Sequence, residues 1–258
     1  MNPSELKLIV QKKYSEIATA PENDKSQSCC TGGCCSPGNY TVFSEDYSHL
    51  EGYNPDADLS LGCGIPVEFA RIKPGDRILD LGSGAGNDCF VARALTGEEG
   101  YVTGIDFTEA MIAKAEENRK RLGYANVGFV RGDIEEMPLP DNTFDIVVSN
   151  CVLNLVPDKR KAFGEIMRVL KPGGHFCVSD VVIRGTLSDK ARNDAELYAG
   201  CVSAASTLDE YLGFIHSNGF TGLTIHSEKR IELPDDILSG TGGESVSGVY
   251  SITVSAHK

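Results

Sequence analysis

Arg77-Ile-Leu-Asp-Leu-Gly-Ser-Gly-Ala-Gly86 is the stretch of this chain that decides the fold. An apolar strand over 77–81 runs directly into three alternating glycines, and a helix is expected to follow over 86–96. Glycine lets the backbone turn tightly and approach a ligand without a Cβ atom in the way. Strand, glycine loop and helix in this order predict a nucleotide-like cofactor site, although a glycine loop can also serve only to pack a helix on a strand.

After residue 73 the sequence alternates between strands and helices, which is typical of a parallel sheet. The expected strands cover 77–81, 100–105, 126–131, 144–149, 175–180, 221–227 and 248–256, and the expected helices 86–96, 108–122, 159–170, 187–201 and 207–217. Lys171-Pro-Gly-Gly174 is expected to end the third of these helices. Thr207 and Glu210 form a capping box at the start of the last one.

We expect two parts in the chain. Residues 1–70 would hold an amphipathic helix over 4–19, a cysteine-rich segment over 21–39 and a cover over 40–70. Residues 71–258 would form the cofactor-binding domain, with an insert on the substrate side at about 185–218. No internal repeat is present, so a single domain with an N-terminal extension is predicted.

Composition limits the function classes. Among the 258 residues, 24 basic against 37 acidic side chains give a net charge of −13, which disfavours nucleic acid and anionic membranes as partners, although an acidic solvated surface explains the charge equally well. No apolar run reaches the roughly 20 residues of a membrane helix, and the N-terminus lacks a signal-peptide pattern. A cytoplasmic protein is therefore predicted. Nine cysteines in a reducing compartment indicate metal, redox or catalytic thiols rather than a disulfide frame.

Acidic residues follow the predicted strands where a nucleoside would be recognised. Asp106 closes the second strand about 20 residues after the glycines, where an acid can accept hydrogen bonds from ribose hydroxyls. Asp133 and Ile134 follow the third strand and offer a carboxylate and an apolar contact to adenine. Position 87 is Asn where a dinucleotide site would have Gly, and Asp80 before the glycines disfavours a phosphate. Asp80 instead suits the cationic amino group of S-adenosylmethionine.

With these motifs, residues 72–180 resemble the class I S-adenosylmethionine-dependent methyltransferases. The resemblance implies an α/β fold of the class I methyltransferase type, a Rossmann-like, seven-stranded, mostly parallel sheet of order 3-2-1-4-5-7-6 with the last strand antiparallel. It also implies cofactor contacts, with the methionine end at Gly82, Gly84 and Asn150, the ribose at Asp106, and the adenine at Asp133 and Ile134. Ser83 and Phe107 are expected in the same cofactor site.

The cysteines fall into three groups. Cys29, Cys30, Cys34 and Cys35 form a cluster, and Cys89 and Cys177 lie inside predicted elements, where buried, structural roles are expected. Cys63, Cys151 and Cys201 lie where loops are expected, and each alone is more often a small buried residue than a ligand. Cys151, however, follows the strand beside the glycine loop, and ligands bind in this fold at the carboxyl ends of such strands.

A narrower resemblance supports a role for these three thiols. Leu61-Gly-Cys63-Gly, Ser149-Asn-Cys151-Val-Leu-Asn-Leu-Val-Pro-Asp158-Lys and Ala199-Gly-Cys201-Val are similar to motifs of the arsenite methyltransferase family, as is Asp80-Leu-Gly-Ser-Gly-Ala-Gly-Asn-Asp-Cys89. This resemblance spans most of residues 40–205. It implies that Cys63, Cys151 and Cys201 bind arsenic(III).

The chemistry is consistent with that implication. Arsenic(III) is soft, and soft thiolate ligands select such centres. Its lone pair can attack a sulfonium methyl without losing a proton, so no general base is required. Expected partners are arsenite or its thiol conjugates and a glutathione or thioredoxin-type reductant. The protein itself is expected to be a monomer.

Two other functions are also consistent with the sequence. A class I methyltransferase acting on a small organic acceptor, quinone-like or sterol-like, would keep its activity without the three cysteines. A non-catalytic thiol protein would bind soft metals without turnover. The four-cysteine cluster could capture arsenic, act as a redox relay or form a zinc knuckle, although adjacent cysteines are awkward for zinc.

Overall fold

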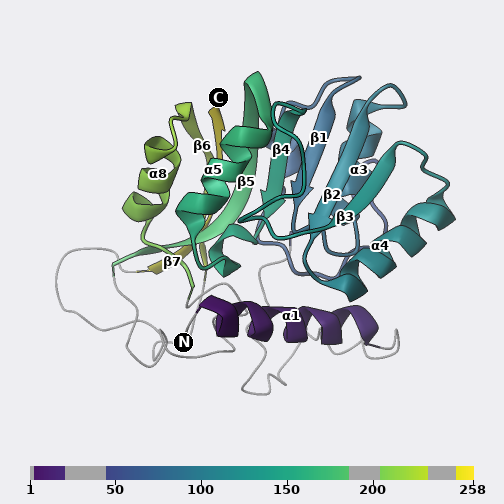
Figure 1. Cartoon of the computed structure of the whole chain (residues 1–258), viewed down its shortest axis with the longest axis horizontal. Coiled ribbons are helices and arrows are strands. Elements are labelled where there is room, and N and C mark those ends of the chain that lie inside the picture. Colours follow the sequence, from purple (N-terminus) through teal and green to yellow (C-terminus); the bar gives the residue numbers. More distant parts are fainter. Residues whose placement is uncertain (1–2, 21–44, 186–203, 232–247) are drawn as a thin grey trace.

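The computed structural model describes residues 3–20, 45–185, 204–231 and 248–258. Its seven strands form one sheet of order β3-β2-β1-β4-β5-β7-β6 (Figure 1). The strands are β1 Arg77–Leu81, β2 Tyr101–Asp106, β3 Val127–Arg131, β4 Phe144–Asn150, β5 Leu170–Arg184, β6 Thr221–Ile231 and β7 Gly248–His257. β7 runs antiparallel to both of its neighbours, and the inner strands are parallel. The predicted class I fold is confirmed.

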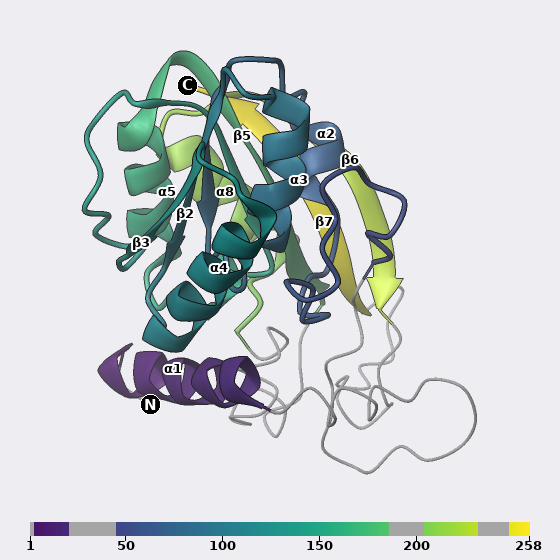
Figure 2. The same cartoon turned by 90° about the vertical axis from the view of Figure 1, so that its right-hand side faces the viewer.

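Helices cover both faces of the sheet. The helices of the described residues are α1 Pro3–Thr19, which lies at the sheet edge, and α2 Pro66–Phe69, α3 Asn87–Thr96, α4 Glu109–Leu122, α5 Lys159–Val169 and α8 Leu208–Ser217, with a short 3-10 turn at Leu153–Leu155. Figure 2 shows α5 and α8 on one side of the sheet and α2 and α3 on the other. Phe163 and Tyr211 anchor the core under the first pair, and Val67 and Phe90 the core under the second.

α1 lies apart from these layers, across the edge of the sheet where the parallel strands end (Figure 1). It packs beside α4, and its buried residues are Val10 and Ala18. The helix predicted over 4–19 is thus confirmed. It forms a roof over the edge at which ligands bind in this fold.

One strand differs from its prediction. β5 begins at Leu170 rather than at residue 175, and Lys171-Pro-Gly-Gly174 is an irregular stretch within its bounds, where Gly173 has a φ of +80°. The register of the β4–β5 pairing shifts between Phe144 and Ile146, and this irregularity accommodates Pro172, which has no N–H to donate. At its other end β5 continues to Arg184 because it pairs with β7 along its length.

The capping box of α8 is confirmed, since the Thr207 hydroxyl accepts from the Glu210 N–H and the Glu210 carboxylate accepts from the Thr207 N–H. The helix predicted over 187–201 lies outside the described residues. Within the described ranges, no helix is long and apolar enough to cross a membrane. The division into residues 1–70 and 71–258 stays a prediction.

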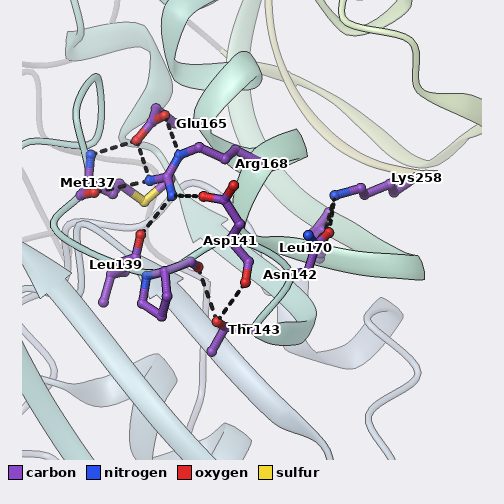
Figure 3. Close-up of polar contacts among 10 residues, drawn as sticks. Met137, Leu139, Asp141, Asn142, Thr143, Glu165, Arg168, Leu170 and Lys258 are labelled. Carbon is purple, nitrogen blue, oxygen red and sulfur yellow. Dashed lines mark hydrogen bonds and ion pairs between the residues drawn. The ribbon is translucent and has the colours of Figure 1, made fainter.

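An arginine on α5 fixes the loop between β3 and β4 (Figure 3). The Arg168 guanidinium donates to the carbonyls of Met137 at 3.0 Å and Leu139 at 2.7 Å, and to the carboxylates of Glu165 and Asp141 at 2.7 Å. Glu165 in turn accepts the Met137 N–H at 2.7 Å. Bidentate guanidinium–carboxylate pairs of this kind are geometrically specific. The loop that follows β3 therefore leaves the sheet along a fixed path.

Candidate cofactor and thiol site

A cavity opens at the carboxyl ends of β1, β2 and β4, beneath α1. It is lined from the roof by Lys7, Val10 and Tyr14, from the segment before β1 by Glu45, Tyr47, Ala57, Asp58, Leu59, Ser60, Leu61 and Gly62, and from the sheet by Gly82, Ser83, Gly84, Ala85, Asn87, Asp88, Asp106, Phe107, Thr108, Gly132, Asp133, Ile134, Asn150, Cys151, Val152, Leu155, Val156 and Pro157. The site predicted at this edge is thus enclosed on three sides.

The glycine loop is held by backbone bonds from the next strand. The N–H groups of Gly82 and Ser83 both donate to the Ile105 carbonyl, at 2.7 and 3.1 Å. The Gly84 N–H donates to an Asp106 carboxylate oxygen at 3.1 Å. Gly84 has a φ of +51°, and a Cβ atom built there would meet no atom within 4 Å. The loop thus presents open backbone to the cavity.

Several polar atoms of the lining are buried and have no hydrogen-bond partner in the described part of the protein. They are Ser83 Oγ, Asn87 Oδ1 and Thr108 Oγ1. Buried polar side-chain atoms are normally paired. Three such atoms around one cavity indicate a site built for a polar ligand.

The charges of the lining select the kind of ligand. Among the described lining residues the carboxylates are Glu45, Asp58, Asp88, Asp106 and Asp133, whereas Lys7 is the one basic side chain. Lys7 is already paired, 2.5 Å from Asp133 and in contact with Glu135. Such a lining is unsuited to the pyrophosphate of a dinucleotide. It fits S-adenosylmethionine, which carries a sulfonium and an ammonium group.

The structure places the predicted cofactor residues as follows. Gly82, Ser83, Gly84, Asp106, Phe107, Asp133, Ile134 and Asn150 all line the cavity. Asp106 also accepts the Thr108 N–H at 2.7 Å, and burial raises its pKa. These contacts leave the individual cofactor roles as predictions, but they bring the residues together as expected.

Asp80 lies behind the lining instead of in it. Its side chain is buried, 2% exposed, and accepts a hydrogen bond from the Cys89 thiol at 3.2 Å. Burial, with the nearby Asp88 carboxylate, raises the pKa of Asp80 well above its usual range. Its predicted contact with the amino group of the cofactor stays a prediction.

Asp88 is the carboxylate that faces the cavity here, and the sequence reasoning missed it. It accepts the Tyr47 hydroxyl at 2.7 Å and the Asn150 amide at 3.3 Å, and burial raises its pKa to about 6. Asp88 lies in the first turn of α3, two residues past the last glycine of the loop. That position was the available signal, whereas nothing near Tyr47 in the sequence pointed to the site.

Of the three predicted arsenic ligands, one lines this cavity and a second lies next to its lining. Cys151 follows β4 and lines it, and Cys63 is 1% exposed beside the lining residue Gly62. Both belong to one apolar cluster that also contains Val10 of the roof and Leu155. Sites remote in sequence are therefore adjacent in space.

For the other cysteines, the structure describes Cys89 and Cys177 and leaves the rest outside the described residues. Cys89 and Cys177 are fully buried, as predicted, and burial raises the pKa of Cys177 to about 12. Cys201 and the cluster of Cys29, Cys30, Cys34 and Cys35 lie outside the residues that the structure describes. Their roles stay predictions.

Comparisons with known proteins agree with this geometry. A family model described as a methyltransferase domain matches residues 72–220. The arsenite methyltransferase of Halobacterium salinarum is 39% identical over 237 residues, which cover 87% of this chain and 59% of that protein. The arsenite methyltransferase of Aquipseudomonas alcaligenes is 32% identical over 243 residues, covering 92% of this chain and 68% of that protein.

A solved structure is also similar. The arsenic(III) S-adenosylmethionine methyltransferase of Chlamydomonas reinhardtii superposes with a TM-score of 0.67 at 38% identity, covering 76% of this chain and 67% of that one. Demethylmenaquinone methyltransferase of Listeria monocytogenes matches a shorter part, 36% identical over 114 residues, 44% of this chain and 48% of that protein.

The chain spans about three fifths of the length of the Halobacterium relative. Its fold, its acidic cavity and the two cysteines of one apolar cluster agree with the extent of these matches. The chain belongs to the arsenite methyltransferase family of class I methyltransferases, whose cofactor is S-adenosylmethionine.

Proposed function

We propose that this chain methylates trivalent arsenic held by cysteine thiolates. One observation carries the proposal. Cys151 lines the cavity that also contains Gly84, Asp106 and Asp133, and Cys63 is buried in the same apolar cluster as Cys151. Soft thiolates beside a site for a methyl donor favour a soft acceptor over a hydroxyl or an amine.

Loading of the substrate needs no catalytic base. Each thiol that joins arsenic replaces a hydroxide of arsenous acid, and the thiol proton leaves with that hydroxide as water. We assign the first two positions to Cys63 and Cys151 and the third to Cys201, which rests on the family resemblance. The apolar cluster around the two described thiols would favour the neutral arsenic–thiolate complex over hydrated ions.

The methyl transfer then depends on positioning. S-adenosylmethionine, when bound, supplies an electrophilic methyl group on its sulfonium. The arsenic lone pair is the nucleophile, so no side chain has to remove a proton, and the described lining residues include no histidine. Asp88 and Asp106 would hold the cationic and ribose parts, and α1 would exclude water from above. Alignment of this kind accounts for large rate accelerations.

Turnover requires a reductant, because forming the As–C bond takes arsenic from the trivalent to the pentavalent state. We propose glutathione or a thioredoxin-type protein for this role, with Cys29, Cys30, Cys34 and Cys35 as a thiol relay. Arsenite or its thiol conjugates would be the substrate of a monomer working in the cytoplasm.

The test is to incubate the full chain with arsenite, S-adenosylmethionine and glutathione, and to separate arsenic species by chromatography with mass-spectrometric detection. Methylated arsenicals are expected from the native chain and from C177A, a matched control whose cysteine is buried in the other core cluster. They should be absent with C151S. Cofactor binding without methylarsenicals would contradict the proposal and favour an organic acceptor. Arsenite binding without cofactor binding would favour a thiol protein that only sequesters arsenic.

A further inference from the structure

The backbone at Cys63 is fixed by strand ends from elsewhere in the fold. The Cys63 N–H donates to Asn150 Oδ1 at 3.0 Å, and the Cys63 carbonyl accepts from the Ser251 hydroxyl of β7. The next carbonyl, that of Gly64, accepts from Asn150 Nδ2 at 2.8 Å, and its oxygen lies 3.1 Å from the Tyr47 hydroxyl. Asn150 therefore contacts the backbone N–H of Cys63 and the carbonyl of the residue that follows it.

The residues flanking Cys63 have to be small for this contact to form. A Cβ atom on Gly62 would lie 2.5 Å from the Asn150 amide nitrogen. One on Gly64 would lie 2.5 Å from the Ser179 hydroxyl of β5. Real Cβ atoms do not approach so closely, so Gly-Cys-Gly matches a surface formed by Asn150 and Ser179.

The hydrogen-bonding capacity of Asn150 is used inside the protein. Its amide oxygen accepts from Cys63, and its two amide protons have the Gly64 carbonyl and the Tyr47 oxygen at 2.8 Å as nearest partners. An asparagine amide offers two donors. Both donors therefore have partners within the protein.

Asn150 and Cys151 are consecutive, so the conformation of this one dipeptide affects the positions of both Cys63 and Cys151. Cys151 has a φ of +60°, a left-handed conformation that non-glycine residues adopt at a cost of about 1 kcal/mol. Its N–H donates to the Ser179 carbonyl at 2.7 Å, which holds the turn. The turn positions Cys151 directly. The hydrogen bonds of the Asn150 side chain position the backbone of Cys63.

We propose that Asn150 is a positioning residue for arsenic capture, holding Cys63 within reach of the arsenic that Cys151 binds. The inference rests on the proposed function and deepens it. A preorganised pair of ligands binds more tightly because less freedom is lost when the substrate arrives. Removing the side chain would leave Cys63 present but unaligned.

The test is a double-mutant cycle on arsenite affinity, measured without cofactor by equilibrium dialysis and elemental analysis of arsenic. N150A should weaken arsenite binding about tenfold, the size of one well-made hydrogen bond to a positioned group. C63S should weaken it more than N150A does, because it removes a thiolate ligand of the soft arsenic centre. The double variant N150A/C63S should be no weaker than C63S, since Asn150 acts through Cys63. Affinity for S-adenosylmethionine, measured by calorimetry, should fall less in N150A than arsenite affinity does.

Asn126 provides a matched control. Its amide also bridges two loop carbonyls, those of Gly97 at 2.8 Å and Gly100 at 3.0 Å, on a different loop. N126A should cost comparable stability and leave arsenite affinity unchanged. If N150A does not fold, N150D serves instead, because it keeps the acceptor for the Cys63 N–H and loses the donor to Gly64, and a loss smaller than tenfold is expected.

These measurements distinguish a failure of the positioning role of Asn150 from a failure of arsenic binding by Cys63. If C63S weakens arsenite binding and N150A does not, the positioning role is wrong while the proposed function stands. Additive losses in the double variant would also overturn it. If C63S itself has no effect, thiol capture by Cys63 fails, and the positioning role fails with it.

Discussion

The ammonium of Lys7 lies 2.5 Å from a carboxylate oxygen of Asp133, although 126 positions separate the two residues. Lys7 also pairs with Glu135, whose side chain is 7% exposed. Through these contacts the roof helix α1 is attached to the loop predicted to hold adenine. Closure of the roof and occupation of the cavity are therefore expected to be linked.

Replacing Lys7 should loosen this roof. K7M removes the ion-pair partner of the buried Glu135 carboxylate, so α1 should exchange its amide hydrogens faster, and cofactor affinity should fall about three- to tenfold. Hydrogen exchange followed by mass spectrometry and calorimetric titration measure both effects. L8A is the control, since Leu8 is 63% exposed on the same helix. Unchanged exchange in K7M would mean that α1 is held by its apolar contacts alone.

Cofactor affinity should depend on pH through Asp88. Burial raises the pKa of this carboxyl to about 6, with Asp80 and Asp58 as charged neighbours and Tyr47 and Asn150 as hydrogen-bond donors. Below that pH the carboxyl is neutral and loses its attraction for a cationic cofactor. Affinity for S-adenosylmethionine should therefore rise by up to about tenfold from pH 5 to pH 7.5. D88N should bind more weakly at pH 7.5 with a flatter profile, and an equally steep profile in D88N would point to another group.

Asp106 should act on the cofactor and not on arsenic. D106A removes the acceptor for the Gly84 and Thr108 N–H groups as well as the predicted ribose contact. Cofactor affinity is expected to fall by about 10- to 100-fold, the loss of one or two hydrogen bonds to a charged group. Arsenite affinity, measured by dialysis, should stay within twofold. Unchanged cofactor affinity would contradict the assignment of Asp106 to the ribose.

The thiols should show the opposite pattern. C151S and C201S should each abolish methylation while calorimetry still detects cofactor binding, because a hydroxyl is a poor ligand for a soft centre. Cys151 is the sharper case, since its side chain lines the cavity. C89S is the control, because a hydroxyl at that position can still donate to Asp80. Turnover retained by C151S or C201S would rule out a three-thiolate complex.

Local pattern predicted much of this structure. The glycine loop and the cavity position of Asp106 and Asp133 follow from alternation and from motifs at strand ends, whereas the strand order follows from the family resemblance. β5 was predicted too short because Pro172 and Gly173 normally end elements, whereas here a register shift against β4 absorbs them. Local turn chemistry gave no sign of that tertiary pairing.

The support for the thiols was not predictable in the same way. Ser251 and Cys63 are 188 positions apart and meet only because β7 inserts beside β5. Tyr47 carries no motif, and its hydroxyl becomes functional by contacting Asp88 and Gly64. Sequence patterns reveal residues that belong to one helix, strand or motif. The contacts of Ser251 and Tyr47 join residues from different parts of the chain, so no local pattern reveals them.

A buried carboxyl behind the thiol cluster should make stability depend on pH. Asp180 is 1% exposed. Its carboxylate accepts hydrogen bonds from the Asn154 amide at 2.8 Å, from the N–H of the next residue, Val181, at 3.0 Å and from the Tyr211 hydroxyl at 3.1 Å. Burial outweighs these donors and raises the pKa of Asp180 to about 7. A carboxyl with a raised folded-state pKa contributes stability that is full below its unfolded pKa and is lost as pH rises through the folded value.

The native chain should therefore lose about 2–3 kcal/mol more unfolding free energy than D180N between pH 5 and pH 8, since one pKa unit corresponds to about 1.4 kcal/mol. Urea unfolding at the two pH values measures the difference. D209N is the control, because Asp209 is exposed on the same helix as Tyr211 and its variant should follow the native chain. Equal pH dependence in D180N and the native chain would mean that Asp180 is ionised throughout this range, with its three donors compensating for burial.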